Sequence, residues 1–292
     1  MRTARIDWMG YVYIFPVFLF LGLFVFWGMF YNFYVSFFEW DGIALEKTFV
    51  GLDNYIQLSK DSDFLDSLGN TAIFTVLYVT IVIVLGFFLS YFLHYNIIGK
   101  TFMKTMVFLP HVFPVSVIAL LFYGFYDMNV GLLNDLLRGI GLGQLAAPWL
   151  GQMETSLYAV LAAFIFAQLG FTFMVYYTSL FSINEEVLEA SHLDGSGFWR
   201  TSIEIVFPIL KGVTLSLVIT GIIATLKIFD IVWLMTQGGP GSSSELASTY
   251  VFKQAMMNYQ QGYASAISVV LLAIAFVITA INLLIYVKGA KK

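Results

Sequence analysis

The sequence lacks cysteine and is poor in charged residues. No cysteine occurs among 292 residues, which excludes disulfide bonds, thiolate metal sites and a cysteine nucleophile. Charged residues make up 11% of the chain, against about a quarter in a soluble domain. The net charge of −4 gives no reason to expect a nucleic-acid partner. His94, His111 and His192 lack the spacing of paired metal ligands, so no metal site is expected.

Motifs for enzymatic chemistry are also missing. The sequence contains neither H-E-x-x-H nor G-x-S-x-G, which leaves a membrane protease or esterase without a metal site or a nucleophile. Gly99-Lys100-Thr101 ends like a phosphate-binding loop, but His94 occupies the position of its first glycine. This segment also follows an apolar helix rather than a buried strand. We therefore predict that the chain is not an enzyme and does not itself bind ATP.

Apolar residues dominate what is present. The chain is 60% hydrophobic and 18% aromatic, with a mean hydropathy of +0.85. A membrane-spanning helix needs about 20 mostly apolar residues. These features predict an all-α polytopic membrane protein with six transmembrane helices. The six segments are residues 11–38, 72–95, 106–126, 156–181, 212–236 and 263–287.

Lys and Arg residues predict the orientation of these spans. With the N-terminus in the cytoplasm, nine of the 14 basic residues lie inside, four lie outside, and Lys227 lies within a span. Both termini are therefore expected in the cytoplasm, as segments 1–10 and 288–292 flanking a transmembrane domain over 11–287. Three outer loops are long enough to act as docking surfaces. They cover residues 39–71, residues 127–155 and the segment that begins at residue 236.

The segment 182–208 carries dense charge between two apolar segments, and we expect it in the cytoplasm. Ser182 followed by Glu185 fits a capping box, which predicts a helix start. Gly195 predicts its end, because glycine adopts a left-handed conformation at little steric cost. A second short helix would follow and end near Pro208. Small residues would let another protein approach the backbone closely, namely Ala190, Ser191, Gly195 and Ser196.

This segment resembles the cytoplasmic coupling loop of ABC-importer permeases, in which Glu-Ala-Ala is followed by Asp-Gly-Ala and then by Pro. Two of the motif alanines are serines here, and Gly212 stands where many relatives have a second proline. An ordinary amphipathic loop helix is the alternative. The resemblance implies that the matching residues contact an ATPase, with a glutamate as polar anchor and a glycine as elbow. They are Glu189, Ala190, Ser191, Asp194, Gly195 and Ser196.

Further short motifs extend the resemblance over nearly the whole chain. They are F-V-G-L-D-N-Y, the Asn70-Thr71 pair, F-L-P at 108–110, L-K-I-F-D at 226–230, T-Q-G-G-P and G-Y-A-S-A, in the expected order. Together they look like the carbohydrate-uptake branch, the maltose and glycerol-3-phosphate type. Gly28 departs from the pattern, because relatives often have proline there. The resemblance implies the fold of a type I ABC-importer permease with a cytoplasmic coupling helix.

Lys227 and Asp230 are the charges expected within a span. They are three residues apart, so on a continuous helix they would share one face. A charge at the bilayer centre is costly, about 2.5–3.5 kcal/mol, and is usually paired or in contact with water. Two roles stay open: an ion pair that fixes the fifth span, or a polar part of a transport path.

Other candidate path residues come from the fourth and fifth spans. Gly221, Thr225 and Phe229 recur every four residues and would form one stripe of mixed size and polarity. The resemblance also places Gly170 and Phe173 on the substrate path of maltose-type relatives. The alternative is that the glycines and the threonine only permit close helix packing.

The resemblance implies a permease subunit of an ATP-driven importer in the bacterial cell membrane. It would import a sugar, an oligosaccharide or a sugar-like solute. Its partners would be a second homologous permease, a cytoplasmic ATPase dimer that binds ATP and Mg²⁺, and an extracytoplasmic solute-binding protein. The alternative is an ion-coupled secondary transporter or channel that uses Lys227 and Asp230 and needs no ATPase.

Overall fold

A computed structural model describes residues 8–95 and 97–290 of the chain. Residues 1–7 of the expected N-terminal cytoplasmic segment lie outside the described residues. So do residues 291–292 of the expected basic tail. The chain forms two compact units. The first contains residues up to 61 together with 251–273, and the second contains 62–250 together with the chain after 273.

The first unit begins with one long apolar helix. α1 (Trp8–Phe20), the π-helical η1 (Leu21–Phe26) and α2 (Trp27–Val35) follow one another without a gap. A short hairpin then pairs β1 (Phe38–Glu39) antiparallel with β2 (Thr48–Phe49), and α3 (Asp53–Leu58) follows. The unit also holds the π-helical η4 (Lys253–Met257) and the first part of α15 (Gln261–Ala290).

Gly262 explains how the hairpin strand lies against the start of α15. A Cβ at this position would collide with the carbonyl group of Phe38, so only glycine fits. The backbone N–H of Gly262 donates to the carbonyl oxygen of Trp40 at 3.0 Å. The glycine of the G-Y-A-S-A motif is therefore required for close packing.

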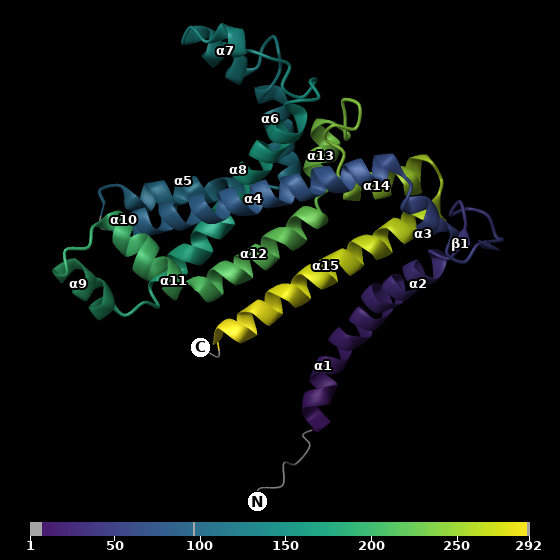
Figure 1. Cartoon of the computed structure of the whole chain (residues 1–292), viewed down its shortest axis with the longest axis horizontal. Coiled ribbons are helices and arrows are strands. Elements are labelled where there is room, and N and C mark those ends of the chain that lie inside the picture. Colours follow the sequence, from purple (N-terminus) through teal and green to yellow (C-terminus); the bar gives the residue numbers. More distant parts are fainter. Residues whose placement is uncertain (1–7, 96, 291–292) are drawn as a thin grey trace, which may run out of the picture. The chain divides into compact units, whose positions relative to one another are not determined.

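The second unit is a bundle of long helices. Figure 1 shows α4 (Ser62–His94), α5 (Lys100–Val112), α8 (Ser156–Leu180) and α12 (Lys211–Leu226) running side by side. α6 (Val115–Phe125) packs against α13 (Asp230–Met235). The bundle core is apolar and includes the fully buried Phe74, Val160 and Ile231. The remaining elements are α7 (Leu132–Gly139), η2 (Gly143–Leu145), α9 (Glu185–Leu193), α10 (Phe198–Arg200), η3 (Thr201–Val206), α11 (Phe207–Ile209) and α14 (Ala247–Phe252).

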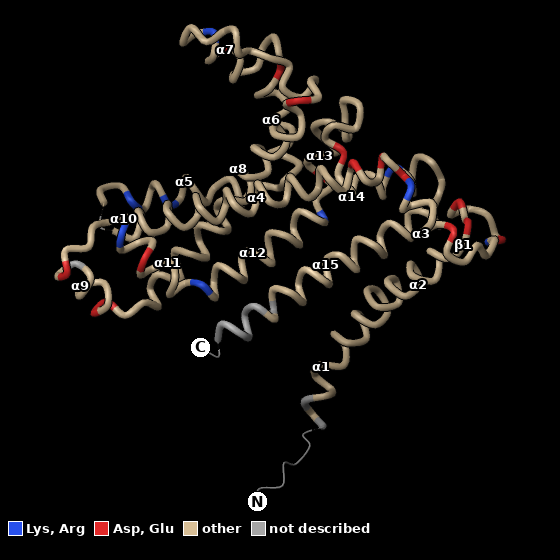
Figure 2. Tube along the Cα trace, in the orientation of Figure 1, with Lys and Arg blue, Asp and Glu red and all other residues tan. Residues whose placement is uncertain are grey.

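Length and composition agree with six membrane spans. Four helical stretches can cross a membrane by themselves, and two bent helix pairs raise the number to six within the described residues. Figure 2 shows that charged residues gather at helix ends and in connecting segments, while the long helices are almost free of them. The four stretches are Tyr11–Val35, Ser62–His94, Ser156–Leu180 and Gln261–Asn282.

Two of the segments predicted as spans, residues 106–126 and 212–236, are interrupted. The third breaks after Val112, and α5 and α6 are bent by 100°. Pro114 is the cause, since proline has no N–H and disfavours a helical conformation of the residue before it. The fifth ends at Leu226 and resumes as α13 at Asp230, so residues 212–236 do not form one helix. The second span also begins at Ser62, ten residues earlier than expected.

Candidate functional site

The segment 182–208 forms two helical arms joined by a tight turn. The first arm is α9, which begins at Glu185. Asn184, not Ser182, provides the cap, because its Oδ1 accepts a hydrogen bond from the N–H of Glu186 at 3.1 Å. The hydroxyl of Ser182 instead donates to the carbonyl oxygen of Ser179. The predicted capping box is therefore wrong, although a helix does start here.

The first arm ends in a glycine turn, as the sequence predicted. The N–H of Ser196 donates to the carbonyl oxygen of Ser191 at 3.0 Å, the six-residue bond of a Schellman motif. Gly195 has a φ of +76°, which favours glycine over any other residue. Apart from the glycine and its chain neighbours, no heavy atom lies within 4 Å of the position that a Cβ would occupy. The turn at Gly195 is therefore sterically open.

Aromatic contacts tie the second arm to the end of α4. This arm runs from α10 through the π-helical η3 to α11. The ring of Phe198 lies 4.9 Å from that of Tyr91, and the ring of Trp199 lies 5.2 Å from that of Phe88. Aromatic pairs of this kind contribute about 0.5–1.5 kcal/mol beyond their buried area. The second arm is thus fixed to a membrane-spanning helix by side chains of considerable size.

The base of the two arms is buried in the bundle. Ile183, Val206 and Leu210 belong to one apolar cluster with Tyr176 of α8 and Phe87 of α4. This cluster joins the ends of the segment to three of the long helices. Because packed cores are stiff, a displacement of the elbow would carry these helix ends with it.

The exposed residues of the segment include some that the sequence did not single out. Glu189, Ala190 and Asp194 are exposed, as a contact surface requires, whereas Ser191 is buried and its hydroxyl donates to the carbonyl oxygen of Leu188. Leu193 and Trp199 are 88% and 64% exposed. A hydropathy pattern cannot reveal them, because it does not distinguish a covered leucine from an exposed one.

On the fourth span, both candidate path residues are packed. A Cβ on Gly170 would lie 2.9 Å from the carbonyl oxygen of Val107 and 3.0 Å from the Cα of Phe108. This glycine therefore lets α8 approach the backbone of α5 closely. Phe173 is completely buried and packs with Leu93 and Tyr177.

On the fifth span, two candidates are buried against α4. A Cβ on Gly221 would lie 3.0 Å from the Cγ2 of Val79. Thr225 is 1% exposed, and its hydroxyl lies 2.8 Å from that of Thr75. Both residues hold α12 against α4 within this unit.

The remaining three candidates lie where the fifth span breaks. Lys227 and Asp230 are both exposed, and they do not form an ion pair with each other or with another described residue. They also do not share one helical face, because α12 ends at Leu226, before Lys227, and Asp230 begins the separate helix α13. Phe229 is half-buried and stacks on Trp233 at 5.5 Å, with an angle of 18° between the rings. Trp233 was not singled out from the sequence.

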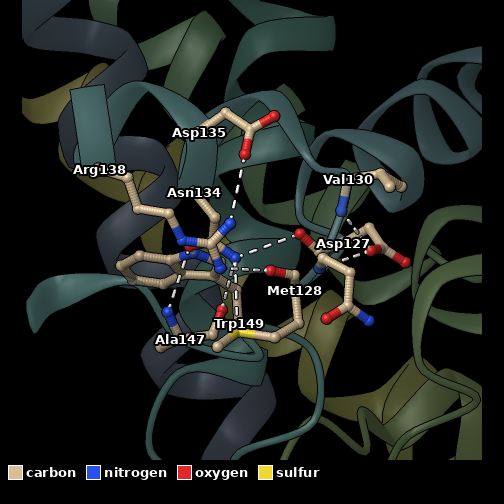
Figure 3. Close-up of polar contacts among 9 residues, drawn as sticks. Asp127, Met128, Val130, Asn134, Asp135, Arg138, Ala147 and Trp149 are labelled. Carbon is tan, nitrogen blue, oxygen red and sulfur yellow. Dashed lines mark hydrogen bonds and ion pairs between the residues drawn. The ribbon is translucent and has the colours of Figure 1, made fainter. Parts of the chain in front are cut away.

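The loop over residues 127–155 is organised around Asn134. This side chain is fully buried, and Figure 3 shows the polar groups that surround it. Its Nδ2 donates to the carbonyl oxygens of Asp127 and Ala147, and its Oδ1 accepts from the indole N–H of Trp149 at 2.9 Å. One amide thus closes the stretch from Asp127 to Trp149 into a folded lobe.

The loop after α13 is attached to α4 and, through the hydroxyl groups of Ser156 and Ser243, to α8. The Nδ2 of Asn70 donates to the carbonyl oxygens of Ser242 and Glu245 at 3.2 and 3.1 Å. The hydroxyl of Thr71 accepts from the N–H of Ala247 at 2.9 Å. The Asn70-Thr71 pair therefore holds the segment that follows the T-Q-G-G-P motif.

Comparison with known proteins gives consistent similarities. Residues 82–287 match the family described as binding-protein-dependent transport system inner membrane component. The chain is 34% identical over 284 residues to a probable ABC transporter permease, YurN, of Bacillus subtilis, and the alignment covers 97% of each protein. It is 32% identical over 285 residues to the diacetylchitobiose uptake system permease NgcF of Streptomyces coelicolor, covering 93% of this chain and 78% of that one.

A solved structure has the same fold. It is a chain of a bacterial alginate ABC transporter in complex with an alginate pentasaccharide-bound periplasmic protein. The two chains superpose with a TM-score of 0.82 at 21% identity, covering 94% of this chain and 93% of the other.

Proposed function

The chain belongs to the family of binding-protein-dependent transport system inner membrane components, and from this we propose that it works as one half of an ATP-driven carbohydrate importer. The family consists of transporter permeases and is not a class of enzymes. Its fold is that of a type I ABC-importer permease with membrane-spanning helices. The solute is a sugar, an oligosaccharide or a sugar-like molecule. A relative named for diacetylchitobiose uptake supports this substrate class.

The chain acts with three kinds of partner. A second homologous permease completes the path, and an extracytoplasmic solute-binding protein delivers the solute. A cytoplasmic ATPase dimer binds ATP and Mg²⁺ and supplies the energy of hydrolysis. The complex lies in the bacterial cell membrane, with both termini of this chain and the segment 182–208 in the cytoplasm. The excess of basic residues on that side supports this orientation.

The observation that carries the proposal is an exposed elbow on a buried base. Glu189, Ala190, Asp194, Gly195 and Ser196 contact the ATPase, and the buried Ser191 supports the turn from beneath. Closure of the ATPase pair displaces the elbow. The aromatic contacts of the second arm then pass this motion to α4, so that the bundle changes from inward-facing to outward-facing.

Along the path, the stacked pair Phe229 and Trp233 offers an aromatic surface where the fifth span breaks. Lys227 and Asp230 lie beside it and are exposed, so they are free to contact a polar solute. Gly170, Phe173, Gly221 and Thr225 shape the path indirectly, by setting the distances between α5, α8, α4 and α12.

Substitutions at Gly195 test the role of the elbow in the reconstituted transporter. Gly195→Trp adds bulk at the contact, Gly195→Ala adds only the strain of a left-handed alanine, and Gly195→Asn tolerates the conformation best. We expect Gly195→Trp to separate ATP hydrolysis from uptake, with Gly195→Asn closest to the wild type. Wild-type coupling in Gly195→Trp would refute the proposal.

An ion-coupled secondary transporter is the competing function. One observation supports it, namely that Lys227 and Asp230 do not form an ion pair with each other. Proteoliposomes distinguish the two functions. ATP supplied on the side of the membrane that carries the ATPase should drive uptake, even in the presence of an ionophore that dissipates ion gradients. Uptake that follows an ion gradient without ATP would favour the secondary transporter.

A further inference from the structure

A cavity of about 230 Å³ lies between the lobe over residues 127–155 and the start of α8. Its walls come from the end of α6, from α7, from the segment 149–155 and from the first turns of α8. All of these belong to the second unit. Pockets for drug-sized ligands measure about 300–1,000 Å³, so this smaller cavity suits a single small chemical group.

The cavity lies where a membrane-spanning helix begins. α8 is long and apolar enough to cross a bilayer, and it starts at Ser156 beside the cavity. Tryptophan and tyrosine prefer the depth at which a span meets the lipid headgroups. Three lining residues are of these types, namely Tyr126, Trp149 and Tyr158. The cavity is therefore placed at the level of the headgroups.

One carboxylate at the cavity lacks a counter-charge. Glu154 lines the cavity and is exposed. It forms no ion pair with a described residue, and the lining contains no Lys, Arg or His. Arg138 of the same lobe is engaged by Asp135 and by the carbonyl oxygen of Met128. A ligand that brings a positive charge would compensate Glu154.

The aromatic walls are not occupied by a cation of the chain. The lysines that lie over aromatic rings in the described residues are Lys47 and Lys104, and their rings do not line this cavity. Tyr158 is 53% exposed, and Trp149 is half-buried. An ammonium group over the face of such a ring gains about 0.5–2 kcal/mol. The two rings and the carboxylate thus favour the same kind of ligand.

An exposed apolar stripe on α8 leads away from the cavity. Tyr158, Ala162 and Phe166 recur every four residues, so they share one face, and all three are exposed. The ring of Phe122 on α6 lies 5.3 Å from that of Phe166 and flanks the stripe. Eight residues of helix span about 12 Å, close to the ~15 Å depth of one leaflet of the hydrocarbon core. A ligand with an apolar chain behind its cation can occupy both features.

The polar groups of the lining do not suit a sugar or a metal ion. The hydroxyl of Thr155 donates to the carbonyl oxygen of Trp149 at 2.7 Å, and the indole N–H of Trp149 donates to Asn134. Glu154 and the hydroxyl of Tyr158 are left, which is few for a ring of hydroxyl groups. Across residues 8–95 and 97–290, no three acidic or histidine side chains converge to hold a metal.

We infer that this cavity binds the ammonium headgroup of phosphatidylethanolamine, with one acyl chain along the stripe. The ammonium group contacts Glu154 and the rings of Trp149 and Tyr158. The chain adds about 0.8 kcal/mol for each buried CH₂ group, so a lipid is held better than a free amine of the same charge. The inference does not depend on which solute is transported. In the proposed orientation the lipid belongs to the outer leaflet.

Photolabelling of the complete transporter in nanodiscs tests the inference. Phosphatidylethanolamine with a diazirine in the upper part of one acyl chain is compared with phosphatidylglycerol that has the same chains, and the labelled peptides are mapped. Glu154→Gln removes the charge and keeps the size of the side chain. Tyr158→Leu removes one ring and keeps an apolar side chain. Asp66→Asn is the matched control, because Asp66 is an exposed carboxylate near the start of α4 that does not line the cavity.

We expect phosphatidylethanolamine to label residues 158–166 of the wild type. Glu154→Gln and Tyr158→Leu should each reduce this labelling about fivefold, the effect of about 1 kcal/mol. Asp66→Asn should stay within about twofold of the wild type. Phosphatidylglycerol should label the segment weakly and respond little to Glu154→Gln, since it has no ammonium group. Unchanged basal ATP hydrolysis shows that the variants are assembled.

Three results would overturn the inference. The first is equal labelling by the two lipids, or labelling that Glu154→Gln leaves unchanged. The second is loss of labelling in the presence of free ethanolamine, which would mean that the cavity takes soluble amines instead of a lipid. The third is cross-linking of residues 158–166 to the second permease in place of lipid, which would mean that a protein covers the stripe. Solute uptake tests the proposed function separately.

Discussion

The hydroxyl groups of Thr75 and Thr225 lie 2.8 Å apart and join α4 to α12. Each also lies within hydrogen-bond distance of a carbonyl oxygen of its own helix, that of Thr71 for Thr75 and that of Ile222 for Thr225. Each hydroxyl group has one proton, so the two protons are shared among these three contacts. The pair is a polar contact inside an otherwise apolar helix interface.

Thr225→Val should therefore act on stability and leave solute affinity unchanged. Loss of one interhelical hydrogen bond in a membrane bundle costs about 0.6 kcal/mol on average. We expect a small fall in the unfolding temperature. The KM for uptake should equal that of the wild type. Thr75→Val/Thr225→Val should lose less than the sum of the single variants, because both remove the same contact. A KM change of several-fold at unchanged stability would instead place Thr225 on the path.

The destabilisation caused by replacing a glycine with alanine should follow how closely the added Cβ approaches neighbouring atoms. Gly170→Ala should destabilise by about 1–3 kcal/mol, since its Cβ would press on the backbone of α5. Gly221→Ala should cost less, because the nearest atom belongs to the side chain of Val79. Gly69→Ala on α4 is the control, with no atom within 4 Å, and should be neutral or slightly stabilising. Thermal unfolding in detergent measures all three, and a reversed order would contradict the packing account.

Hydropathy predicted the number of spans but not their interruptions. Segments such as 156–181 are apolar all round, so composition alone identifies them. The break at Pro114 has a visible cause in the sequence, whereas the break after Leu226 has no proline and depends on backbone geometry that an apolar run does not encode. For the same reason the sequence could not show that Phe173 faces the core. A helix without a polar face gives no sign of which side is buried.

The glycine elbow was predictable because it depends on one residue type. Gly195 adopts the left-handed conformation that the Asp-Gly pair suggested. Asn134 was not predictable, because its partners Asp127 and Trp149 are set by the fold of the lobe. A single asparagine in a loop has no pattern that distinguishes it from any other polar residue.

Asn134→Asp should unfold the lobe over residues 127–155. A carboxylate would place a second acceptor against the carbonyl oxygens of Asp127 and Ala147, where the amide now donates. Leaving buried acceptors without a donor costs about 1–3 kcal/mol each. We expect faster hydrogen exchange and protease cleavage within the lobe only. Asp135→Asn is the control, because the ion pair of Asp135 with Arg138 is exposed and contributes little. Equal protection in Asn134→Asp and the wild type would disprove the role of this amide.

Acid should loosen the turn that begins the same lobe. The Oδ1 of Asp127 accepts the N–H groups of Val130 and Asn129, and these bonds lower the pKa of its carboxyl group below 3.8. A lowered pKa in the folded state means that the stabilisation is complete above the unfolded pKa. It is lost as the pH falls through the folded value. Protection of residues 127–131, corrected for intrinsic exchange, should be flat from pH 7 to about 5 and should fall below about 4.

Asp127→Asn separates the charge from the hydrogen bonds of this turn. An amide oxygen can still accept both N–H groups but does not titrate in this range. The variant should start with lower protection and lose none of it between pH 5 and 3. A variant that keeps the acid response of the wild type would assign that response to another group.

Asn184→Ala and Ser182→Ala distinguish the observed cap of α9 from the one that the sequence suggested. Loss of an N-terminal cap costs about 0.5–2 kcal/mol, so Asn184→Ala should fray the first arm and speed amide exchange over residues 185–189. Ser182→Ala removes only a bond to the preceding turn and should leave this exchange unchanged. A frayed arm transmits less displacement, because its contact residues no longer move with the base. The Asn184 variant should therefore hydrolyse ATP with less uptake per ATP, whereas Ser182→Ala should couple normally; the opposite ranking would mean that Ser182 caps the helix after all.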